Sequence, residues 1–471
     1  MTMTRVMVVT ALSATLVACS THASLSPDGG GGTGGASGGA GAGPGQVVVD
    51  YPQTINRNVD VLFMIDNSSS GTVYEAKLNE SFSTYVNALQ ALPGGLPNLH
   101  LAVVSSSLGA GRSTDIDRCP AGGDQGAFQT KPLGTTCASA SLNPGQTFIV
   151  NASGTANYTG ALADVFSCIS ALGDGGCGFE HQLASIARAL GADGAPPPAQ
   201  NANFLRPDAY LQIVVLSDED DCSAPPDSDL FDTSSQLVSD PLGPLQSYRC
   251  NEFGHLCGGK MPPRSPAGPT DLGTCVSNEN GRLLRVGDLV AQLKHLKTDP
   301  AKVYVAAISA PPTPYVVNVG PPEIKTDPSM WPYVQHSCMS ADGTYGDPAV
   351  RTKQWVDGFG ANGLFETICA DTFTPALQAI AGQIAHVIGP PCLDATIDPA
   401  TCTFVDHTID ATSGAVSSVP LPRCASGATQ PACWDVVSDA RCPSNEYLKF
   451  MRTGTGIVES STATCTKKGS P

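Results

Sequence analysis

The chain has 471 residues, including 50 glycines and 17 cysteines, and its 42 acidic residues outnumber its 25 basic ones to give a net charge of −17 at pH 7. This acidic balance argues against nucleic acid and anionic lipid as partners, and it suits divalent cations or basic molecules. The many cysteines indicate export to an oxidising compartment. The sequence contains no C-x-x-C and no H-E-x-x-H, so we do not expect a zinc or thioredoxin-like enzyme.

The first 18 residues are typical of a secretory signal, because Arg5 precedes an apolar run from Val6 to Val17. That run is too short to span a bilayer as a helix. The sequence "LVAC", Leu16–Cys19, resembles the bacterial lipobox, which implies cleavage before Cys19 and lipidation of its thiol. Residues 19–46 are dominated by glycine and are expected to form a flexible tether. We therefore expect a lipid-anchored protein of the bacterial cell envelope, at the outer membrane or the cell surface.

Four apolar runs predict the buried strands of a parallel sheet, because their hydrophobicity is continuous rather than alternating. Between them, apolar residues recur at helical spacing, and a last helix is expected to begin at Thr374 with Pro375 in its first turn. This order of elements predicts an α/β fold with a doubly wound, mostly parallel sheet and helices on both faces. The runs are Val59–Ile65, Leu99–Ser105, Tyr210–Leu216 and Val303–Ile308, and the helical stripes are Phe82, Val86 and Leu89, then Leu183, Ile186, Ala187 and Leu190, then Leu289, Leu293 and Leu296.

Three long insertions rich in Gly, Pro, Asp and Cys interrupt the α/β domain, which we expect to cover residues 47–390. They lie near residues 108–157, 219–282 and 311–364. Loops of this length are uncommon unless they are functional or separately stabilised, so we expect disulfides to hold them. In "CNEFGHLC", Cys250–Cys257, both cysteines are expected to form disulfides and His255 to face solvent.

The last part of the chain, residues 391–471, contains six cysteines and few apolar residues. So small an apolar content cannot form a strong core by itself, and disulfides commonly stabilise such segments. We expect a small, Cys-rich, strand-rich appendage.

Two aspartates directly follow predicted strands: Asp66 ends the first run and Asp218 follows the third. Because parallel strands share one carboxyl edge, the fold would bring both carboxylates to the same place. Ser68 and Ser70 stand two and four residues after Asp66, and in an extended loop they point the same way. Two carboxylates and two hydroxyls are hard oxygen ligands that suit Mg²⁺, Mn²⁺ or Ca²⁺. The alternative is an ordinary turn without a metal.

These residues also carry a family resemblance. The sequence "DNSSS", Asp66–Ser70, resembles the D-x-S-x-S motif of von Willebrand factor type A (vWA) domains, and "LSDED", Leu216–Asp220, is similar to their later strand-end aspartate. "GGCGFEHQL", Gly175–Leu183, resembles a group of bacterial surface lipoproteins that carry this domain. The resemblance covers about Val47–Gly389. It implies a metal-ion-dependent adhesion site (MIDAS), whose cation leaves a coordination position open for an acidic group of a protein or peptide partner.

The sequence departs from this family in the Gly-rich loop that usually supplies a threonine ligand, because Cys177 stands at that place. If Cys177 forms a disulfide, for example with Cys168, it offers no hard ligand, and Glu180 or Thr159 would have to replace it. The sequence does not decide between these two. The run "DEDD", Asp218–Asp221, clusters carboxylates that a second Ca²⁺ would relieve; a solvated acidic loop is the alternative.

We therefore predict an envelope-anchored binding module that captures a protein or other acidic ligand through a divalent cation. An enzyme is not expected, because Glu180 and His181 are adjacent in sequence on a helix and do not face each other, and no nucleophile stands out. The competing hypothesis is a structural scaffold of the envelope with a vestigial, metal-free site.

Overall fold

The computed structural model describes residues 46–52, 56–92, 95–130, 137, 140–152, 154–324, 327–388, 393, 395–409, 416–424, 432–438, 444–452 and 458–468. The predicted signal sequence, Cys19 and nearly all of the glycine-rich tether lie outside these residues. In the part of the chain that is described, no helix is both long enough and apolar enough to cross a membrane.

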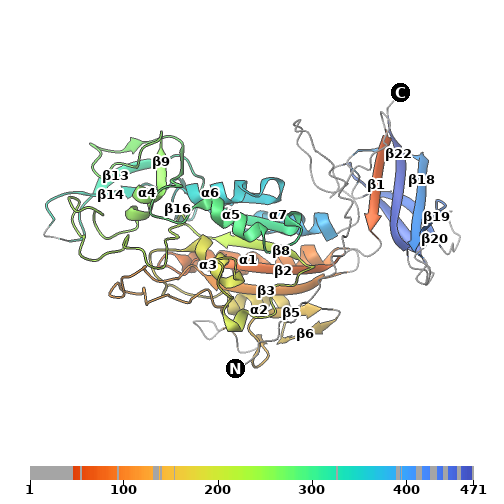
Figure 1. The fold of residues 1–471 in the computed structure, drawn as a ribbon, viewed down its shortest axis with the longest axis horizontal. Coiled ribbons are helices and arrows are strands. Elements are labelled where there is room, and N and C mark those ends of the chain that lie inside the picture. Colours follow the sequence, from red (N-terminus) through yellow and green to blue (C-terminus); the bar gives the residue numbers. More distant parts are fainter. Residues whose placement is uncertain are drawn as a thin grey trace, which may run out of the picture. The chain divides into compact units, whose positions relative to one another are not determined.

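A seven-stranded sheet forms the centre of the α/β domain (Figure 1). The strands predicted from the four apolar runs are all present. The first five strands in spatial order are parallel, and the last two are antiparallel to their neighbours. In that order they are β17 (Gly363–Thr367), β12 (Val303–Ser309), β8 (Tyr210–Leu216), β2 (Asn58–Ile65), β3 (Asn98–Ser105), β5 (Ile149–Ala152) and β6 (Thr155–Ala156).

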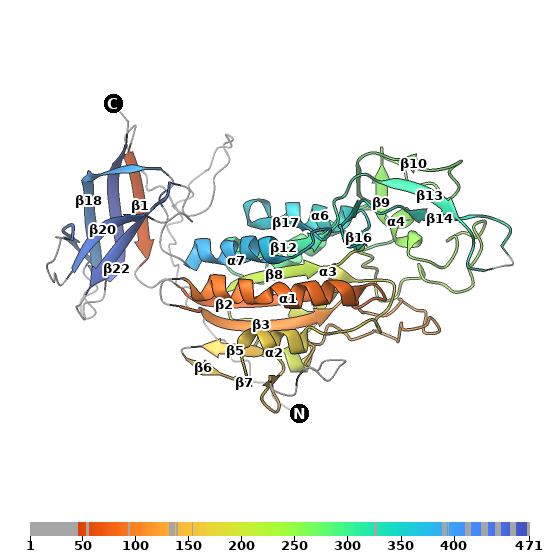
Figure 2. The ribbon, with the colours of Figure 1, turned by 180° about the vertical axis from the view of Figure 1, so that it is seen from behind.

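Helices cover both faces of this sheet. Along β2, Val61 and Phe63 point into one apolar core, whereas Leu62 and Met64 point into the other. This explains why the run is continuously apolar, and it confirms the doubly wound α/β fold that the vWA resemblance implies. One face carries α1 (Gly71–Gln90), α2 (Leu162–Ile169) and α7 (Thr374–Ile388), as Figure 2 shows; the other carries α3 (Gln182–Leu190), α5 (Val286–Lys294) and α6 (Val350–Asp357).

Three strands of the sheet were not predicted. β5 and β6 lie inside the expected insertion 108–157, and β17 begins at the end of the insertion 311–364. They are short and lie at the two margins of the sheet, where β5 and β17 are only partly buried and β6 is exposed, so they lack the continuous apolar run on which the prediction depended. The third helical stripe was predicted to include Leu296, but α5 ends at Lys294.

The insertions consist of short elements tied together by disulfides, as expected. Figure 2 shows that the elements of the second and third insertions gather beyond one end of the sheet. The elements are β4 (Ser141–Leu142), β7 (Tyr158–Thr159), α4 (Tyr248–Gly254), β9 (His255–Cys257), β10 (Thr270–Asp271), β11 (Cys275–Ser277), β13 (Val316–Gly320), β14 (Trp331–Val334), β15 (Cys338–Met339) and β16 (Tyr345–Gly346). Single 3₁₀ turns are η1 (Ala199–Asn201), η2 (Pro300–Lys302) and η3 (Gly360–Asn362).

Two expectations about cysteine-rich segments were wrong. Cys177 pairs with Cys119, and Cys168 pairs with Cys137, so these two cysteines are not bonded to each other. His255 does not face solvent, because it is only 1% exposed. Further bridges join Cys222 to Cys250, Cys257 to Cys275 and Cys338 to Cys369.

The C-terminal residues form a separate group of strands, in agreement with the expected appendage. A four-stranded sheet has the order β1 (Gln46–Pro52), β22 (Val458–Lys467), β18 (Ile397–Ile409) and β19 (Val416–Pro420), and β20 (Ala432–Ser438) pairs with β21 (Glu446–Arg452). Phe404, Trp434 and Leu448 form its core, and disulfides join Cys402 to Cys465 and Cys424 to Cys433. Because β1 pairs with β22, it belongs to this sheet, although the α/β domain was expected to begin at residue 47.

Candidate metal centre

β2 and β8 are neighbours at the point where the strand order of the main sheet reverses. If β2, β3, β5, β8, β12 and β17 are numbered along the chain, their spatial order is 3-2-1-4-5-6. Ligands of such sheets bind beyond the carboxyl ends of the strands at this reversal. Asp66 follows β2 and Asp218 follows β8, and the Asp66 amide donates a hydrogen bond to the Leu216 carbonyl (3.0 Å). The topology therefore brings both predicted acids to the same edge.

The loop from Asp66 to Ser70 is folded tightly between β2 and α1. The Ser68 amide donates to Asp66 Oδ1 (2.8 Å). Gly71 opens α1, and a Cβ atom there would lie 2.6 Å from the Asp66 carbonyl oxygen. Only glycine permits this close approach, so the residue after the serines is fixed by the geometry of the loop.

Hydroxyl groups connect the two acids. The Ser68 and Ser70 Oγ atoms are 3.2 Å apart, and the Ser70 hydroxyl donates to Asp218 Oδ1 (3.2 Å). Asp66, Ser68 and Asp218 are each no more than 3% exposed. The structure thus brings Asp66, Ser68, Ser70 and Asp218 together, as the sequence predicted.

Two further serines contact Asp66, and sequence reasoning missed both. The Ser217 hydroxyl donates to Asp66 Oδ2 (2.6 Å), and the Ser106 hydroxyl lies 3.4 Å from Asp66 Oδ1. Each follows a strand of the sheet, Ser217 after β8 and Ser106 after β3. A search for all hydroxyls just beyond predicted strand ends would have found them.

The two central carboxyl groups are buried, and within the described part of the chain neither has a compensating positive charge in contact. Burial raises the pKa of Asp66, although hydrogen bonds from Ser217 and Ser68 oppose this shift. Burial, and then repulsion from Asp66 and Glu219, raise the pKa of Asp218 well above its ordinary range. Among the described residues, no Lys, Arg or His forms an ion pair with either group.

The Gly-rich loop packs directly against this centre but offers no hydroxyl from Cys177. The Gly176 amide donates to the Asn67 carbonyl (2.7 Å), and a Cβ atom at Gly176 would clash with the Asn67 side chain at 2.2 Å. Cys177 is fully buried in its disulfide with Cys119. Thr159 is one of the two residues considered as a replacement for the missing threonine ligand. It is exposed on β7, and no hydrogen bond within the described chain joins it to Asp66 or Asp218.

Glu180, the other substitute considered, lies next to the centre and faces Glu219. It is 2% exposed, and its Oε1 atom has no hydrogen-bond partner among the described residues. Burial, then repulsion from Glu219 and Asp66, raise the pKa of Glu180 well above its ordinary range. Burial also raises the pKa of Glu219 to about 7, while the hydrogen bond with Glu180 opposes that shift. Both shifts favour the protonated form of these two neighbouring carboxyl groups.

The last two acids of the "DEDD" run are neutralised within the protein. Asp220 accepts hydrogen bonds from His255 (2.8 Å) and from the Arg351 amide (2.8 Å). Asp221 forms an ion pair with the Arg351 guanidinium (2.9 Å). Both are buried. The run is therefore not a solvated acidic loop, and these two carboxylates are not available to a second Ca²⁺.

The oxygens around Asp66 and Asp218 fit a small divalent cation. Within the described chain, no group of three or more His, Cys, Asp and Glu side chains is arranged to hold a metal; the donors here are two carboxylates and two hydroxyls. Adjacent ligands of an octahedral Mg²⁺ at about 2.1 Å are about 3 Å apart. The two spacings of 3.2 Å that involve Ser70 are close to this value. Asp66 Oδ1 accepts two hydrogen bonds, whereas Asp66 Oδ2 and Asp218 Oδ1 each accept one from a neighbouring serine and keep a lone pair for a cation.

The sequence matches no family model and no curated protein. Among solved structures it is similar to a von Willebrand factor type A protein from Catenulispora acidiphila (12% identity, TM-score 0.25, 89% of this chain and 60% of that one). It is also similar to BatB from Bacteroides thetaiotaomicron (10%, 0.26, 70% and 98%) and to the pilus adhesin RrgA from Streptococcus pneumoniae (10%, 0.28, 89% and 58%). These similarities are too distant to carry information on function.

Proposed function

We propose that this chain is a lipid-anchored envelope protein whose α/β domain binds a divalent cation and, through it, an acidic group of a protein or peptide partner. The observation that carries the proposal is the buried chain of oxygens from Asp66 through Ser68 and Ser70 to Asp218, which lacks a basic partner among the described residues. Clustered carboxylates repel one another, and a cation relieves that repulsion.

The residues of the centre have distinct roles in this proposal. Asp66, Ser68, Ser70 and Asp218 would hold the cation, while Ser217 and Ser106 fix the orientation of the Asp66 carboxylate. A bound Mg²⁺, Mn²⁺ or Ca²⁺ supplies an electrophilic position that an incoming carboxylate can occupy. Glu180 and Glu219 lie beside the centre as a second pair of carboxyl groups, and burial raises the pKa of both.

The third insertion forms a rim beside Asp218 that would contact the partner. The Asp347 amide donates to the Asp218 carbonyl (2.7 Å), which ties this insertion to the centre. His336 and Tyr345 stack with their ring centroids 3.6 Å apart, and both are exposed. Exposed aromatic rings on a rigid framework are common contact residues in interfaces, so we assign partner selection to this rim.

Presentation at the envelope rests on the N-terminal sequence. Cys19 and the glycine-rich tether would link the domain to a membrane through acyl chains, and two or more chains are needed for firm attachment. Mass spectrometry of the mature N-terminus tests this directly: a diacylated or triacylated Cys19 is expected, and an unmodified Cys19 would overturn the anchor.

We propose no catalytic role. Both ring nitrogens of His181 are occupied, because Nδ1 accepts from the Ala224 amide (3.2 Å) and Nε2 donates to the Gly109 carbonyl (3.0 Å). Burial also lowers the pKa of His181 to about 4. A histidine with both nitrogens occupied inside the protein is unsuited to proton transfer with Glu180 or a substrate.

Calorimetric titration of the mature protein with Mn²⁺ tests the cation site. We expect one saturable site in the wild type and none in Asp66→Ala, with the fold of the variant unchanged by circular dichroism. Asp227→Ala removes an acid that is largely exposed and is expected to leave the titration unchanged. Equal Mn²⁺ affinity in the wild type and Asp66→Ala would overturn the proposal.

The second candidate is a metal-free scaffold, and the observation that favours it is the disulfide that occupies the place of the threonine ligand. Melting temperatures separate the two. A cation that binds only the native state raises stability by mass action, by about 2.7 kcal/mol at one hundred times Kd. A melting temperature that does not change with millimolar Mg²⁺ or Ca²⁺ would support the scaffold.

A further inference from the structure

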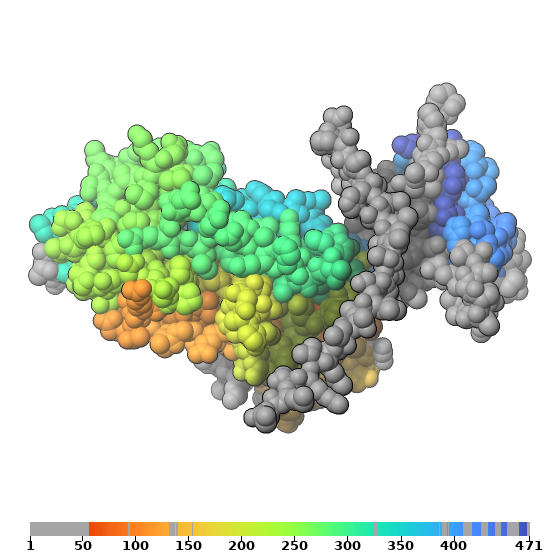
Figure 3. Space-filling model, viewed as in Figure 1, coloured from red at the N-terminus to blue at the C-terminus, as the bar shows by residue number. Residues whose placement is uncertain are grey.

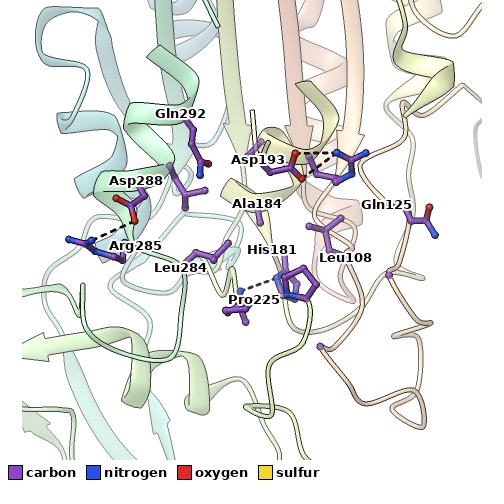
Figure 4. Close-up of a pocket in the computed structure, with 17 residues that line it drawn as sticks. Leu108, Gln125, His181, Ala184, Asp193, Pro225, Leu284, Arg285, Asp288 and Gln292 are labelled. Atoms are coloured by element: carbon purple, nitrogen blue, oxygen red, sulfur yellow. Dashed lines mark hydrogen bonds and ion pairs between the residues drawn. The ribbon is translucent and has the colours of Figure 1, made fainter. Parts of the chain in front are cut away.

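A cavity of about 500 Å³ lies between α3 and α5, on one face of the main sheet (Figure 4). Protein interiors are close-packed and contain few voids larger than a water molecule. A hollow of this size falls in the range of pockets that bind small molecules. None of the six residues proposed or considered as cation ligands lines it, so it is distinct from the candidate metal centre.

The cavity exists because α3 presents small side chains where it faces α5. Ala184 and Ala187 line it from α3, opposite Leu289 of α5. Leu284, before α5, and Ala224 complete an apolar floor. Figure 4 shows Leu284, Ala184 and Leu108 pointing toward the same space. An apolar lining of this kind gains free energy when an apolar group replaces the water beside it.

The titratable group nearest the floor is uncharged. His181 is 3% exposed, and its ring nitrogens are both engaged, with the Ala224 amide and the Gly109 carbonyl. The ring therefore presents a neutral, mainly apolar edge to the cavity, and it leaves no free donor or acceptor for a ligand.

Charged residues flank the cavity as opposite pairs. Arg188, in the last turn of α3, lies 3.2 Å from Asp193, and it also donates to the Pro196 carbonyl. Arg285 and Asp288 lie 3.7 Å apart at the start of α5. Figure 4 shows the two pairs on opposite sides of the apolar floor. Because each arginine faces an aspartate, the rim carries no excess charge and gives no advantage to a charged ligand.

One polar atom at the cavity lacks a partner among the described residues: Gln292 Oε1, which is buried. A buried acceptor without a hydrogen bond costs free energy, which a ligand that brings a donor would recover. Specific pockets commonly combine an apolar lining with a few such polar groups.

We propose that this cavity is a binding site for an uncharged, largely apolar small organic molecule that carries one N–H or O–H donor. The apolar lining selects the body of the ligand, the paired charges disfavour ionised ligands, and Gln292 accepts the donor. The site is independent of cation binding.

N-phenyl-1-naphthylamine is a suitable probe, because it is neutral and apolar, carries one N–H and fluoresces in apolar surroundings. Titration of the mature protein in EDTA is expected to show one saturable site with a Kd on the order of 10 μM. Its sulfonated analogue 8-anilino-1-naphthalenesulfonate has the same ring system with a negative charge, and it is expected to bind at least tenfold more weakly. Absence of saturable binding, or equal affinity for the charged analogue, would overturn the proposal.

Variants then locate the probe. Ala184→Phe fills the cavity and should weaken binding of the probe at least tenfold, whereas Gln292→Leu keeps the volume, removes the acceptor and should weaken binding about threefold to tenfold. Ala291→Phe places the same ring on the exposed side of α5 and should change nothing. Unchanged binding in both Ala184→Phe and Gln292→Leu would place the probe elsewhere and contradict the proposal. Asp66→Ala should retain the probe, so failure of the cation site would not be mistaken for failure of this one.

Discussion

The two ends of β2 each bury an aspartate, and the protein treats them differently. At the first end, Asp60 is fully buried and paired with Arg206 (2.8 Å) and Lys297 (3.4 Å). At the other end, Asp66 is surrounded by hydroxyls and by Asp218, with no ion pair in the described chain. A buried charge is costly unless it is paired or coordinates a metal. Asp60 is therefore part of the framework, whereas Asp66 has the surroundings of the proposed cation site.

The same contrast recurs within the acidic run Asp218–Asp221, which begins two residues after the end of β8. Asp220 and Asp221 are held by His255 and Arg351. Asp218 instead accepts from Ser70, and Glu219 faces Glu180, with the pKa of both glutamates raised by burial. Adjacent acids in one loop therefore divide into a framework pair and a pair that faces the proposed cation.

The largest effect is expected from matched substitutions of Asp60 and Asp66, the aspartates at the two ends of β2. Asp60→Asn leaves the buried Lys297 and the partly buried Arg206 without their partner and should lower the free energy of unfolding by about 3–5 kcal/mol. Asp66→Asn removes a charge that repels Asp218, and in EDTA it should change the free energy of unfolding by less than about 1 kcal/mol. Urea unfolding in EDTA measures both. A larger loss in Asp66→Asn than in Asp60→Asn would contradict the comparison.

A second prediction compares a disulfide beside the proposed cation site with a disulfide of the C-terminal sheet. Replacing Cys119 and Cys177 together by serine should lower stability by about 2–4 kcal/mol and also weaken Mn²⁺ binding, because this disulfide holds the loop that packs on Asn67. The double replacement of Cys402 and Cys465 is the matched control, and it should leave Mn²⁺ binding unchanged. The prediction fails if both pairs affect Mn²⁺ binding equally.

A third prediction concerns pH. The pKa of Glu219 is raised to about 7 in the folded protein, so its protonated form is favoured by folding. This contribution to stability is complete below the ordinary range near 4.5 and is lost as the pH rises through about 7. In EDTA the melting temperature should therefore fall between about pH 5 and pH 8, by roughly 5 °C.

In the same pH series, added Mg²⁺ should stabilise the protein most at the alkaline end, because the carboxyl groups have lost their protons there and the cation offsets their repulsion. Glu219→Gln should flatten the profile in EDTA. Differential scanning fluorimetry measures these shifts, and a melting temperature that rises with pH in EDTA would be incompatible with buried, unpaired acids at this edge.

The smallest effect is expected from Glu180→Gln. Glu180 contacts Glu219, and no hydrogen bond of the described residues joins it to Asp66 or Asp218. Its loss should therefore weaken Mn²⁺ binding by less than about tenfold, or about 1.4 kcal/mol. Complete loss of binding, as expected for Asp66→Ala, would instead make Glu180 a direct ligand in place of the missing threonine.

The sequence could predict those parts of the fold that depend on local pattern. Continuous apolar runs located β2, β3, β8 and β12, and their order placed Asp66 and Asp218 at one edge. Strands at the margins, such as β17, have too few buried residues to give such a signal.

Local sequence patterns could not predict ion pairs and disulfides between residues that are far apart in the chain. The sequence around Asp221 gives no sign that it pairs with Arg351. The sequence around Cys177 likewise does not show that its disulfide partner is Cys119 rather than Cys168. For the same reason His255 was expected to face solvent, because its partner Asp220 lies 35 residues earlier, at the start of the same insertion. Hydroxyls such as Ser217 were missed because serine is common in turns and carries a weak signal by itself.

The central claim is that Asp66, Ser68, Ser70 and Asp218 together hold one divalent cation. Crystals of the mature protein soaked in Mn²⁺, with diffraction recorded near the manganese absorption edge, test it most directly. The account predicts one anomalous peak at about 2.2 Å from oxygens of Ser68 and Ser70, with Asp66 and Asp218 beside it. Fully soaked crystals with no peak at this edge of the sheet, or with manganese bound only at other acids, would contradict it.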